Sequence, residues 1–178
     1  VFSGNGKQLL NKKTPYEIIT ANINESGYHA IATKERGYKS QVLVYNLKDE
    51  QIFAWHSTKY HVISLAVANN NHGMIVSVFD VEGGEENAFK TLYFSFGKEK
   101  PEEIESGVGN LVANLKSVGN RIYAIGDSAF YAYSENGKKV FNICKKLLTN
   151  AQTFGIIISA SSAKATRRVW RSTQEAEE

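Results

Sequence analysis

The sequence predicts an all-β protein: a partial β-propeller of about three four-stranded antiparallel blades, followed by an irregular C-terminal tail. Three observations predict this fold class. A hairpin motif recurs 131 residues apart, a strand-turn-strand unit recurs at a nearly constant spacing, and the 178 residues include nine Tyr and nine Phe. Aromatic side chains favour strands because they pack well on a pleated surface.

The recurring hairpin motif is the clearest sign of internal repetition. Residues 2–11 read FSGNGKQLLN and residues 133–142 read YSENGKKVFN, so Ser, Asn, Gly, Lys and the last Asn coincide. Their offset is close to three periods of about 44 residues, within the range of four-stranded propeller blades. Asn-Gly between two apolar stretches predicts a tight primed turn, because both residues tolerate a positive φ.

Three strand-turn-strand units occupy the chain between these motifs. When they are aligned on Ile23, Val67 and Leu115, their spacings are 44 and 48 residues. A third and a fourth strand follow each unit, rich in β-branched and aromatic residues and bounded by Gly, Asn, Asp and Ser. The expected strands are 18–23, 28–33, 41–45 and 51–55, then 62–68, 74–79, 89–96 and 102–105, then 111–118, 121–125, 129–133 and 138–141.

The expected domain is the repeat region 1–142. Its blades cover about residues 12–56, 57–106 and 107–142, and residues 1–11 complete a preceding blade. An irregular β-sandwich or a single large meander is the alternative, because its strands alternate and turn at similar spacings. The residues shared by the two Asn-Gly motifs favour true repetition.

Residues 143–178 are expected to form a tail outside the repeat. An extra strand over 153–159 fits the period, but the turn and second strand that should follow it are missing. Propellers close with roughly four to eight blades, so three blades would leave apolar end faces open to water. Together with a start at Val1 instead of Met, this predicts a piece of a longer protein, or a chain that assembles with another copy.

Charge and composition exclude several classes of partner. The net charge of +3 comes from residues 143–178, which hold six basic and three acidic residues, whereas residues 1–142 hold 15 of each. A neutral body lacks the basic face that nucleic acid requires. No apolar run approaches the roughly 18 residues of a membrane span, and the single Cys144 excludes an internal disulfide.

No motif predicts a catalytic residue, a cofactor or a metal ion. The Gly-rich segment 106–111 lacks the third glycine and the helix of a dinucleotide site, so we interpret it as a turn between blades. The acidic segment 80–87 lacks EF-hand spacing and is expected to be a solvated hairpin loop. His56 and His61 flank one turn and could meet across it, but no histidine pair has a metal-ligand spacing or a Cys partner.

Aromatic residues supply the only candidate binding positions. Most of them should pack between blades, which need bulky residues on both faces of each sheet. Tyr38 and Tyr60 are expected to lie in loops, where a ring could stack on a sugar or a base. They are therefore the candidate binding-loop residues.

Three segments resemble a known family: residues 25–33 (ESGYHAIAT), 37–45 (GYKSQVLVY) and 120–127 (NRIYAIGD). The repeat is similar to an uncharacterised bacterial domain-of-unknown-function family, found mainly in Firmicutes, with propeller repeats of the WD40 or PQQ type. The likeness covers residues 1–142 and ends at the tail. It implies a membrane-anchored protein with an extracytoplasmic propeller, and it carries over no catalytic residue. The Trp-Asp and Gly-His signatures of true WD40 blades are absent from this chain.

The function expected from these features is a non-enzymatic propeller segment that serves as a scaffold for protein interaction or ligand sensing. The partner would be an unidentified protein or small ligand, or a second copy bound through exposed blade faces. One alternative is a carbohydrate-binding or enzymatic propeller whose site needs missing blades. Another is a truncated fragment without function. A fold alone never establishes function.

Overall fold

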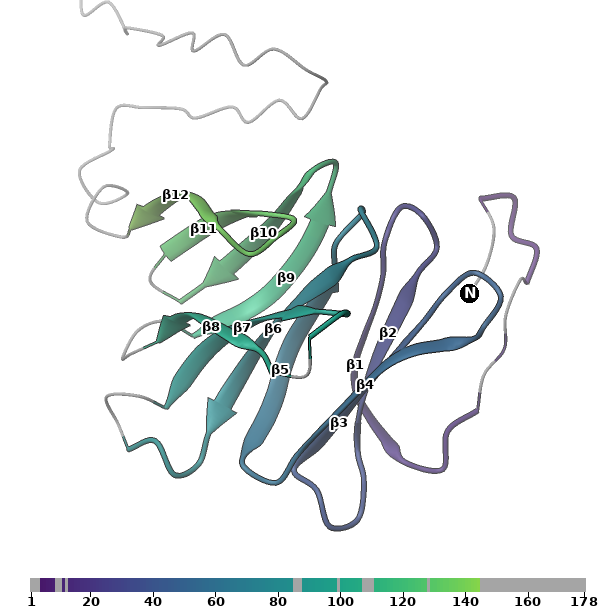
Figure 1. The fold of residues 1–178 in the computed structure, drawn as a ribbon, viewed down its shortest axis with the longest axis horizontal. Coiled ribbons are helices and arrows are strands. Elements are labelled where there is room, and N and C mark those ends of the chain that lie inside the picture. Colours follow the sequence, from purple (N-terminus) through teal and green to yellow (C-terminus); the bar gives the residue numbers. More distant parts are fainter. Residues whose placement is uncertain are drawn as a thin grey trace, which may run out of the picture.

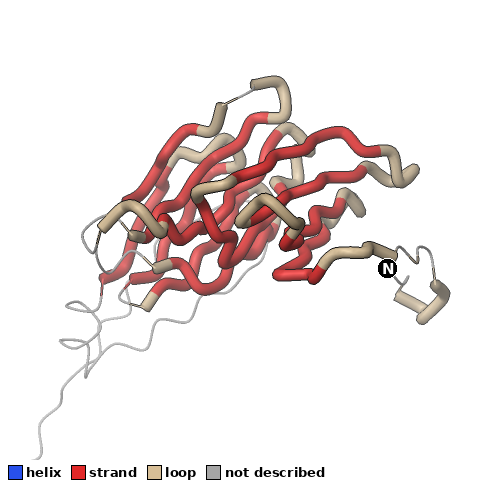
Figure 2. The backbone as a smooth tube through the Cα atoms, turned by 90° about the horizontal axis from the view of Figure 1, so that it is seen from below, coloured by secondary structure: helices blue, strands red, loops and turns tan. Residues whose placement is uncertain are grey.

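A computed structural model describes residues 4–8, 11, 13–84, 88–98, 100–106, 111–127 and 129–144. All regular elements among these residues are strands, and none is a helix (Figure 2). There are twelve, in three sheets of four. They are β1 (Glu17–Ile23), β2 (His29–Lys34), β3 (Ser40–Tyr45), β4 (Gln51–Ser57), β5 (Tyr60–Val67), β6 (Gly73–Asp80), β7 (Phe89–Ser95), β8 (Glu102–Ser106), β9 (Val112–Val118), β10 (Arg121–Gly126), β11 (Ala129–Ser134) and β12 (Lys139–Cys144).

Each sheet is an antiparallel meander whose strands lie in chain order. The orders are β1-β2-β3-β4, β5-β6-β7-β8 and β9-β10-β11-β12. We call these sheets blades 1, 2 and 3. The first strands lie side by side, because β1 packs against β5 and β5 packs against β9, and the sheets fan out from this inner row (Figure 1). The expected fold class is confirmed: the chain forms three blades of a partial β-propeller.

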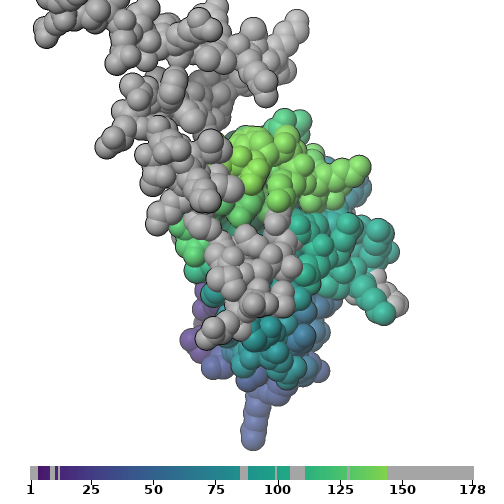
Figure 3. All heavy atoms as spheres, turned by 90° about the vertical axis from the view of Figure 1, so that its left-hand side faces the viewer, coloured from purple at the N-terminus to yellow at the C-terminus, as the bar shows by residue number. Residues whose placement is uncertain are grey.

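The blades follow one another along an arc. Seen from the side, the colours run from blue through teal to green, which is the order of the sequence (Figure 3). The exact domain limits stay a prediction, as does the assignment of residues 1–11 to a preceding blade. The expected extra strand at 153–159 lies outside the described residues.

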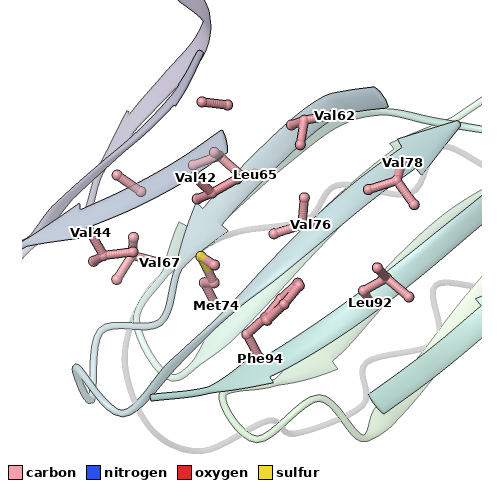
Figure 4. Packing of buried hydrophobic residues seen from close by; sticks show 12 residues of the cluster. Val42, Val44, Val62, Leu65, Val67, Met74, Val76, Val78, Leu92 and Phe94 are labelled. Carbon is pink, nitrogen blue, oxygen red and sulfur yellow. The ribbon is translucent and has the colours of Figure 1, made fainter. Parts of the chain in front are cut away.

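The seam between blades 1 and 2 holds an apolar core. Small and β-branched residues of blade 1 meet larger residues of blade 2 (Figure 4). Phe94 is 1% exposed, and its ring meets Phe53 at 5.8 Å and Trp55 at 5.0 Å between centroids. The buried members of this core are Ala30, Ala32, Val42 and Val44 from blade 1 and Val62, Leu65, Val67, Met74, Val76, Val78, Leu92 and Phe94 from blade 2.

The seam between blades 2 and 3 combines an apolar cluster with a polar contact. Its apolar cluster includes Ile75 of blade 2 and Ile122 of blade 3. The Ser64 hydroxyl of blade 2 accepts a hydrogen bond from the Leu115 amide of blade 3 at 3.0 Å. Such a bond between a side chain and the backbone determines the position of one sheet relative to the other. Apolar contacts alone restrain that position less strongly.

The Asn-Gly motif forms a different turn from the one expected. Gly137 donates to the Ser134 carbonyl at 3.0 Å, and Ser134 donates to the Lys138 carbonyl at 2.8 Å. Gly137 has a φ of 81°, but Asn136 has no positive φ. This is a type I turn followed by a left-handed residue in a G1 bulge, so the prediction of a primed turn was wrong. One left-handed residue is enough here because the bulge, and not the turn itself, restores the strand twist.

The same turn recurs in blade 1 and supports the repeat. Residues 24–28 and 46–50 close with the same two backbone hydrogen bonds. The left-handed position is held by Gly27 at a φ of 82° and by Asp49 at a φ of 61°. At the N-terminal motif, Gly6 has a φ of 81°, the value of Gly137. The glycines of the two motifs that revealed the period therefore share a left-handed backbone conformation.

Gly137 is also required for packing. A Cβ atom at this position would lie 2.6 Å from Cγ of Tyr93 in blade 2. The Asn-Gly sequence therefore meets two constraints in blade 3, the positive φ and the close approach of a ring from the neighbouring blade.

The Phe94→Ala substitution should destabilise the protein by about 3–5 kcal/mol, because it removes a buried ring from the first seam and leaves a cavity. Urea unfolding followed by fluorescence would measure the loss. Val81→Ala is the control, since Val81 is exposed in the loop after β6 and should change the stability by less than about 0.5 kcal/mol. Equal effects of the two substitutions would contradict the packing described for this seam.

Candidate functional site

The loops of blades 1 and 2 at one end of the sheets carry the candidate binding residues. Because the strands alternate in direction, the loop residues 35–39, 58–59 and 81–84 lie at one end, which we call the connecting end. The turns 24–28, 46–50 and 68–72 lie at the other end, the hairpin end. Both predicted binding-loop residues, Tyr38 and Tyr60, lie at the connecting end.

Tyr38 lies in the β2–β3 loop, as predicted, and is 42% exposed. Its ring packs against His56 of β4, with 5.0 Å between centroids. The Thr33 hydroxyl donates to Gln41 Oε1 at 3.2 Å, and Gln41 Nε2 lies 2.7 Å from His56 Nε2. Since the Gln41 amide nitrogen can only donate, His56 Nε2 accepts and the ring proton of neutral His56 sits on Nδ1. Tyr38 therefore rests on a histidine whose orientation is fixed from inside the sheet.

Tyr60 differs from the prediction, because it is the first residue of β5 and not part of a loop. Its ring stacks on Trp55 at 6.3 Å, and the Lys59 ammonium lies 5.4 Å from its centroid. The connection after β4 is only two residues long, so the strand begins at once and the Tyr60 ring joins the seam between blades 1 and 2. Tyr60 is therefore a half-buried packing residue.

The acidic loop does not present Asp80 to solvent. Asp80 is 2% exposed, and its carboxylate pairs with the Lys59 ammonium at 3.0 Å. It also accepts a hydrogen bond from the Glu82 amide at 3.1 Å. The hydrogen bond with Asp80 raises the pKa of Lys59. Asp80 thus fixes the β4–β5 connection to the β6–β7 loop and is not positioned as a cation ligand.

At the connecting end, the ammonium groups of two lysines lie near His61. Burial lowers the pKa of His61, and the nearby ammonium groups of Lys39 and Lys34 lower it further. The hydrogen bond from the Val62 amide to the Ser40 hydroxyl, at 2.9 Å, holds the start of β3 beside β5 and so keeps Lys39 near His61.

The structure does not bring His56 and His61 together. His56 of blade 1 contacts Tyr38 and Gln41, whereas His61 lies on β5 of blade 2. Within the described ranges, no group of three or more His, Cys, Asp or Glu residues is placed to hold a metal ion. The Gly-rich residues 107–110 lie outside the described residues. In the described part of the chain no helix is both long and apolar enough to cross a membrane.

Sequence reasoning missed the polar network at the hairpin end. Asn69 Nδ2 donates to the Gly119 carbonyl at 2.7 Å, and the Glu25 amide donates to Asn69 Oδ1 at 3.0 Å. Glu25 Oε1 accepts from the Gly119 amide at 2.9 Å, which joins blade 1 directly to blade 3. The repeated Asn in the turns was visible in the sequence, but its partners are residues 44 and 50 positions away.

The outer faces of blades 1 and 3 carry apolar side chains that no described blade covers. On blade 3, Tyr123 stacks on Phe130 at 5.8 Å, and Phe130 meets Phe141 at 6.1 Å. Ile125 on this face is 53% exposed. On blade 1, Ile23 is 48% exposed. Exposed apolar surface that is contiguous over several strands marks an interaction site more often than a solvated face.

Replacing Lys39 by Gln should raise the pKa of His61 toward its ordinary value, because one of the two ammonium groups that oppose protonation is removed. NMR titration of the His61 ring would measure it. Lys48→Gln at the hairpin end is the matched control and should leave the titration unchanged. Because the folded protein binds this proton more weakly than the unfolded chain, His61 should lower the stability as the pH falls below about 6.5. An unchanged His61 titration in the Lys39 variant would contradict the assigned cause.

Comparisons with known proteins leave the activity of the chain open. No curated protein matches the sequence. The structure is similar to that of a gluconolactonase from Xanthomonas campestris, with 9% sequence identity, a TM-score of 0.47 and coverage of 80% of this chain and 53% of that chain. The chain thus spans about half the length of the enzyme that it matches. The profile of a family of unknown function, DUF5711, matches residues 1–170, and the chain therefore belongs to that family.

Proposed function

We propose that the chain is a propeller segment that binds protein through the outer faces of its end blades, and that it carries out no catalytic step. The observation that carries the proposal is the exposed apolar face of blade 3. Tyr123, Phe130 and Phe141 form a continuous aromatic row there, with Ile125 beside it.

The packing of blade 2 supports this proposal. Blade 2 has a blade on each side, and Val76 on one face and Ile75 on the other are both 0% exposed. Blades 1 and 3 have one such neighbour each among the described residues. A sheet with two apolar faces gains stability from covering both, at about 25 cal/mol for each Å² of apolar surface removed from water. A partner that presents an apolar sheet would therefore be bound by the same hydrophobic effect that holds the blades together.

The expected location is part of the same proposal. The resemblance to membrane-anchored proteins with an extracytoplasmic propeller supports a place outside the cytoplasm. A scaffold at that location would meet other surface proteins through its open faces.

The proposal can be tested with a photo-reactive phenylalanine analogue, benzoylphenylalanine, placed at Ile125 in the protein expressed in its own cells. A covalent adduct with a protein is expected after illumination. The analogue at Val81 is the matched control, since Val81 is 52% exposed and Ile125 is 53% exposed, but Val81 lies in a loop. It should give no adduct, because a loop residue is not on the bound face.

Two outcomes would overturn the proposal. The absence of any protein adduct from Ile125 would show that the face of blade 3 binds no protein. Retention of the protein on an immobilised glycan, lost on Tyr38→Ala and kept in the Ile125→Lys variant, would favour the carbohydrate-binding alternative at the connecting end.

A further inference from the structure

We propose that the connecting end of the first seam binds an oxyanion, a phosphate or sulfate group, between Lys34, Lys39 and His61. The inference goes beyond the proposed function, because it concerns the connecting end and not the outer faces of the blades. It assigns a chemical class of ligand to a cluster of basic side chains that blades 1 and 2 build together.

One hydrogen bond between the two blades brings two of the basic residues together. The Val62 amide of β5 donates to the Ser40 hydroxyl of β3 at 2.9 Å, and Ser40 is 0% exposed. Lys39 directly precedes Ser40, and His61 directly precedes Val62. The buried hydrogen bond therefore places a basic residue of blade 1 beside a basic residue of blade 2.

Lys34 reaches the same place from β2. In the register of β2 and β3, Thr33 pairs with Gln41, so the next residue, Lys34, lies opposite the buried hydroxyl of this hydrogen bond. Strand β2 also packs against β5. Burial lowers the pKa of His61 most, and the ammonium groups of Lys39 and Lys34 lower it further. Register and electrostatics therefore agree that the three basic groups lie close together.

Backbone hydrogen bonds hold this arrangement in place without a ligand. The Lys39 amide donates to the Ser57 carbonyl at 2.7 Å. The Ser57 hydroxyl accepts from the amides of Lys59 at 3.1 Å and Tyr60 at 2.8 Å. The loop that carries Lys39 and the start of the strand that carries His61 are therefore both attached to the end of β4. Little backbone entropy is lost when a ligand binds to such a preorganised site.

Two carboxylates of the connecting end have partners outside this cluster. The Tyr16 hydroxyl donates to Glu35 Oε1 at 2.8 Å. The Lys59 ammonium pairs with the Asp80 carboxylate at 3.0 Å. These contacts leave the charges of the cluster to a ligand.

Lys34 and Lys39 are both exposed, and neither forms an ion pair with a residue that the structure describes. Glu17 of β1 is the register partner of Lys34, but no ion pair joins the two. Strand β9, on the other side of β5, has one charged residue, Lys116, which lies toward the hairpin end. Among the described residues, the charged groups that act on His61 are the two lysines of the cluster. A site with this local charge attracts an anion.

A tetrahedral oxyanion fits the donors of the cluster. Each ammonium group offers three N–H donors, and a neutral imidazole offers one. A phosphate or sulfate group presents acceptor oxygens in several directions, so it bonds to all three side chains at once. Hydrogen bonds between charged groups are also stronger than neutral ones. Residues 1–142 hold 15 basic and 15 acidic residues, so the cluster suits a single anionic group and not a polyanion.

Anion binding and protonation of His61 should favour each other. Burial and two neighbouring ammonium groups oppose protonation of the ring in the free protein. A bound anion adds negative charge beside the ring and so raises the pKa of His61. By linkage, the anion binds more tightly as the pH falls through this pKa.

NMR titration of the full chain with sulfate tests this inference. Sulfate keeps its double charge between about pH 5.5 and about pH 7.5, one unit on each side of the ordinary histidine pKa. It should move the His61 ring resonances along a saturable curve and raise the pKa of His61. Sodium chloride at equal ionic strength is the reference and should do neither. Binding should be about fivefold tighter at the lower pH, the factor expected for one added charge at a hydrated site.

Four variants separate this site from a general effect of charge. Lys34→Gln and Lys39→Gln should each weaken sulfate binding by about fivefold or more. Lys48→Gln removes the same charge at the hairpin end and should leave the affinity unchanged. His61→Gln should keep the binding at the higher pH and lose its pH dependence.

Two further probes distinguish the sources of the oxyanion. Glycerol 3-phosphate represents a soluble phosphate monoester, and vesicles of phosphatidylcholine with phosphatidic acid represent a lipid headgroup. Competition of glycerol 3-phosphate with sulfate, without binding of the protein to the vesicles, would assign the site to a soluble ligand. Co-sedimentation with the vesicles that both lysine variants of the cluster lose would assign it to a lipid surface.

Two results would refute the site. One is a response of His61 to sulfate no larger than its response to chloride. The other is an equal loss of affinity in Lys39→Gln and Lys48→Gln, because binding would then follow net charge and not this cluster. Neither result bears on the protein adduct expected from Ile125, so the proposed function is tested separately.

Discussion

The whole structure depends on one constraint: a β-sheet with two apolar faces must cover both of them. Blade 2 meets the constraint within the chain, because blade 1 lies on one of its faces and blade 3 on the other. Its strand β6 accordingly contains almost only buried residues. In blade 3 the same constraint leaves Ile125 and Phe141 open to solvent. Covering one face by the next blade explains why the blades repeat. A face that no described blade covers stays exposed, and it is there that we propose a partner binds.

Polar contacts between the turns determine how the blades are placed relative to each other. Apolar faces pack in many registers, but a side-chain amide that bonds to a backbone carbonyl selects one. Asn24 is buried and donates to the Ala68 carbonyl at 2.8 Å, and Asn69 repeats the contact toward Gly119. These bonds join the inner ends of consecutive blades. They explain why Asn recurs in the turns of a chain whose cores are otherwise unlike each other.

Most of the fold could be predicted from the sequence because strand patterns are local. Turn residues and aromatic or β-branched runs identified the strands to within a few residues, and the recurrence of Asn-Gly gave the period. The type of turn could not be predicted, because Asn-Gly suits both a primed turn and a G1 bulge, and Gly137 is fixed by Tyr93 of another blade. Tyr60 was placed in a loop because the sequence does not show that the connection before it is only two residues long. Two contacts at the connecting end could not be predicted, because the sheets bring together residues that are far apart in the sequence. Gln41 orients His56, on which Tyr38 packs, from 15 positions away. Lys59 pairs with Asp80 from 21 positions away.

Native-state hydrogen exchange tests the central claim most directly, since it reports the protection of each strand separately. If both faces of blade 2 are covered by its neighbours, the amides of β5, β6 and β7 should exchange slowest, through global unfolding, whereas β1 and β12 open locally at lower free energy. Uniform protection of the three blades, or faster exchange in blade 2 than in blades 1 and 3, would contradict the stacking of the blades described above.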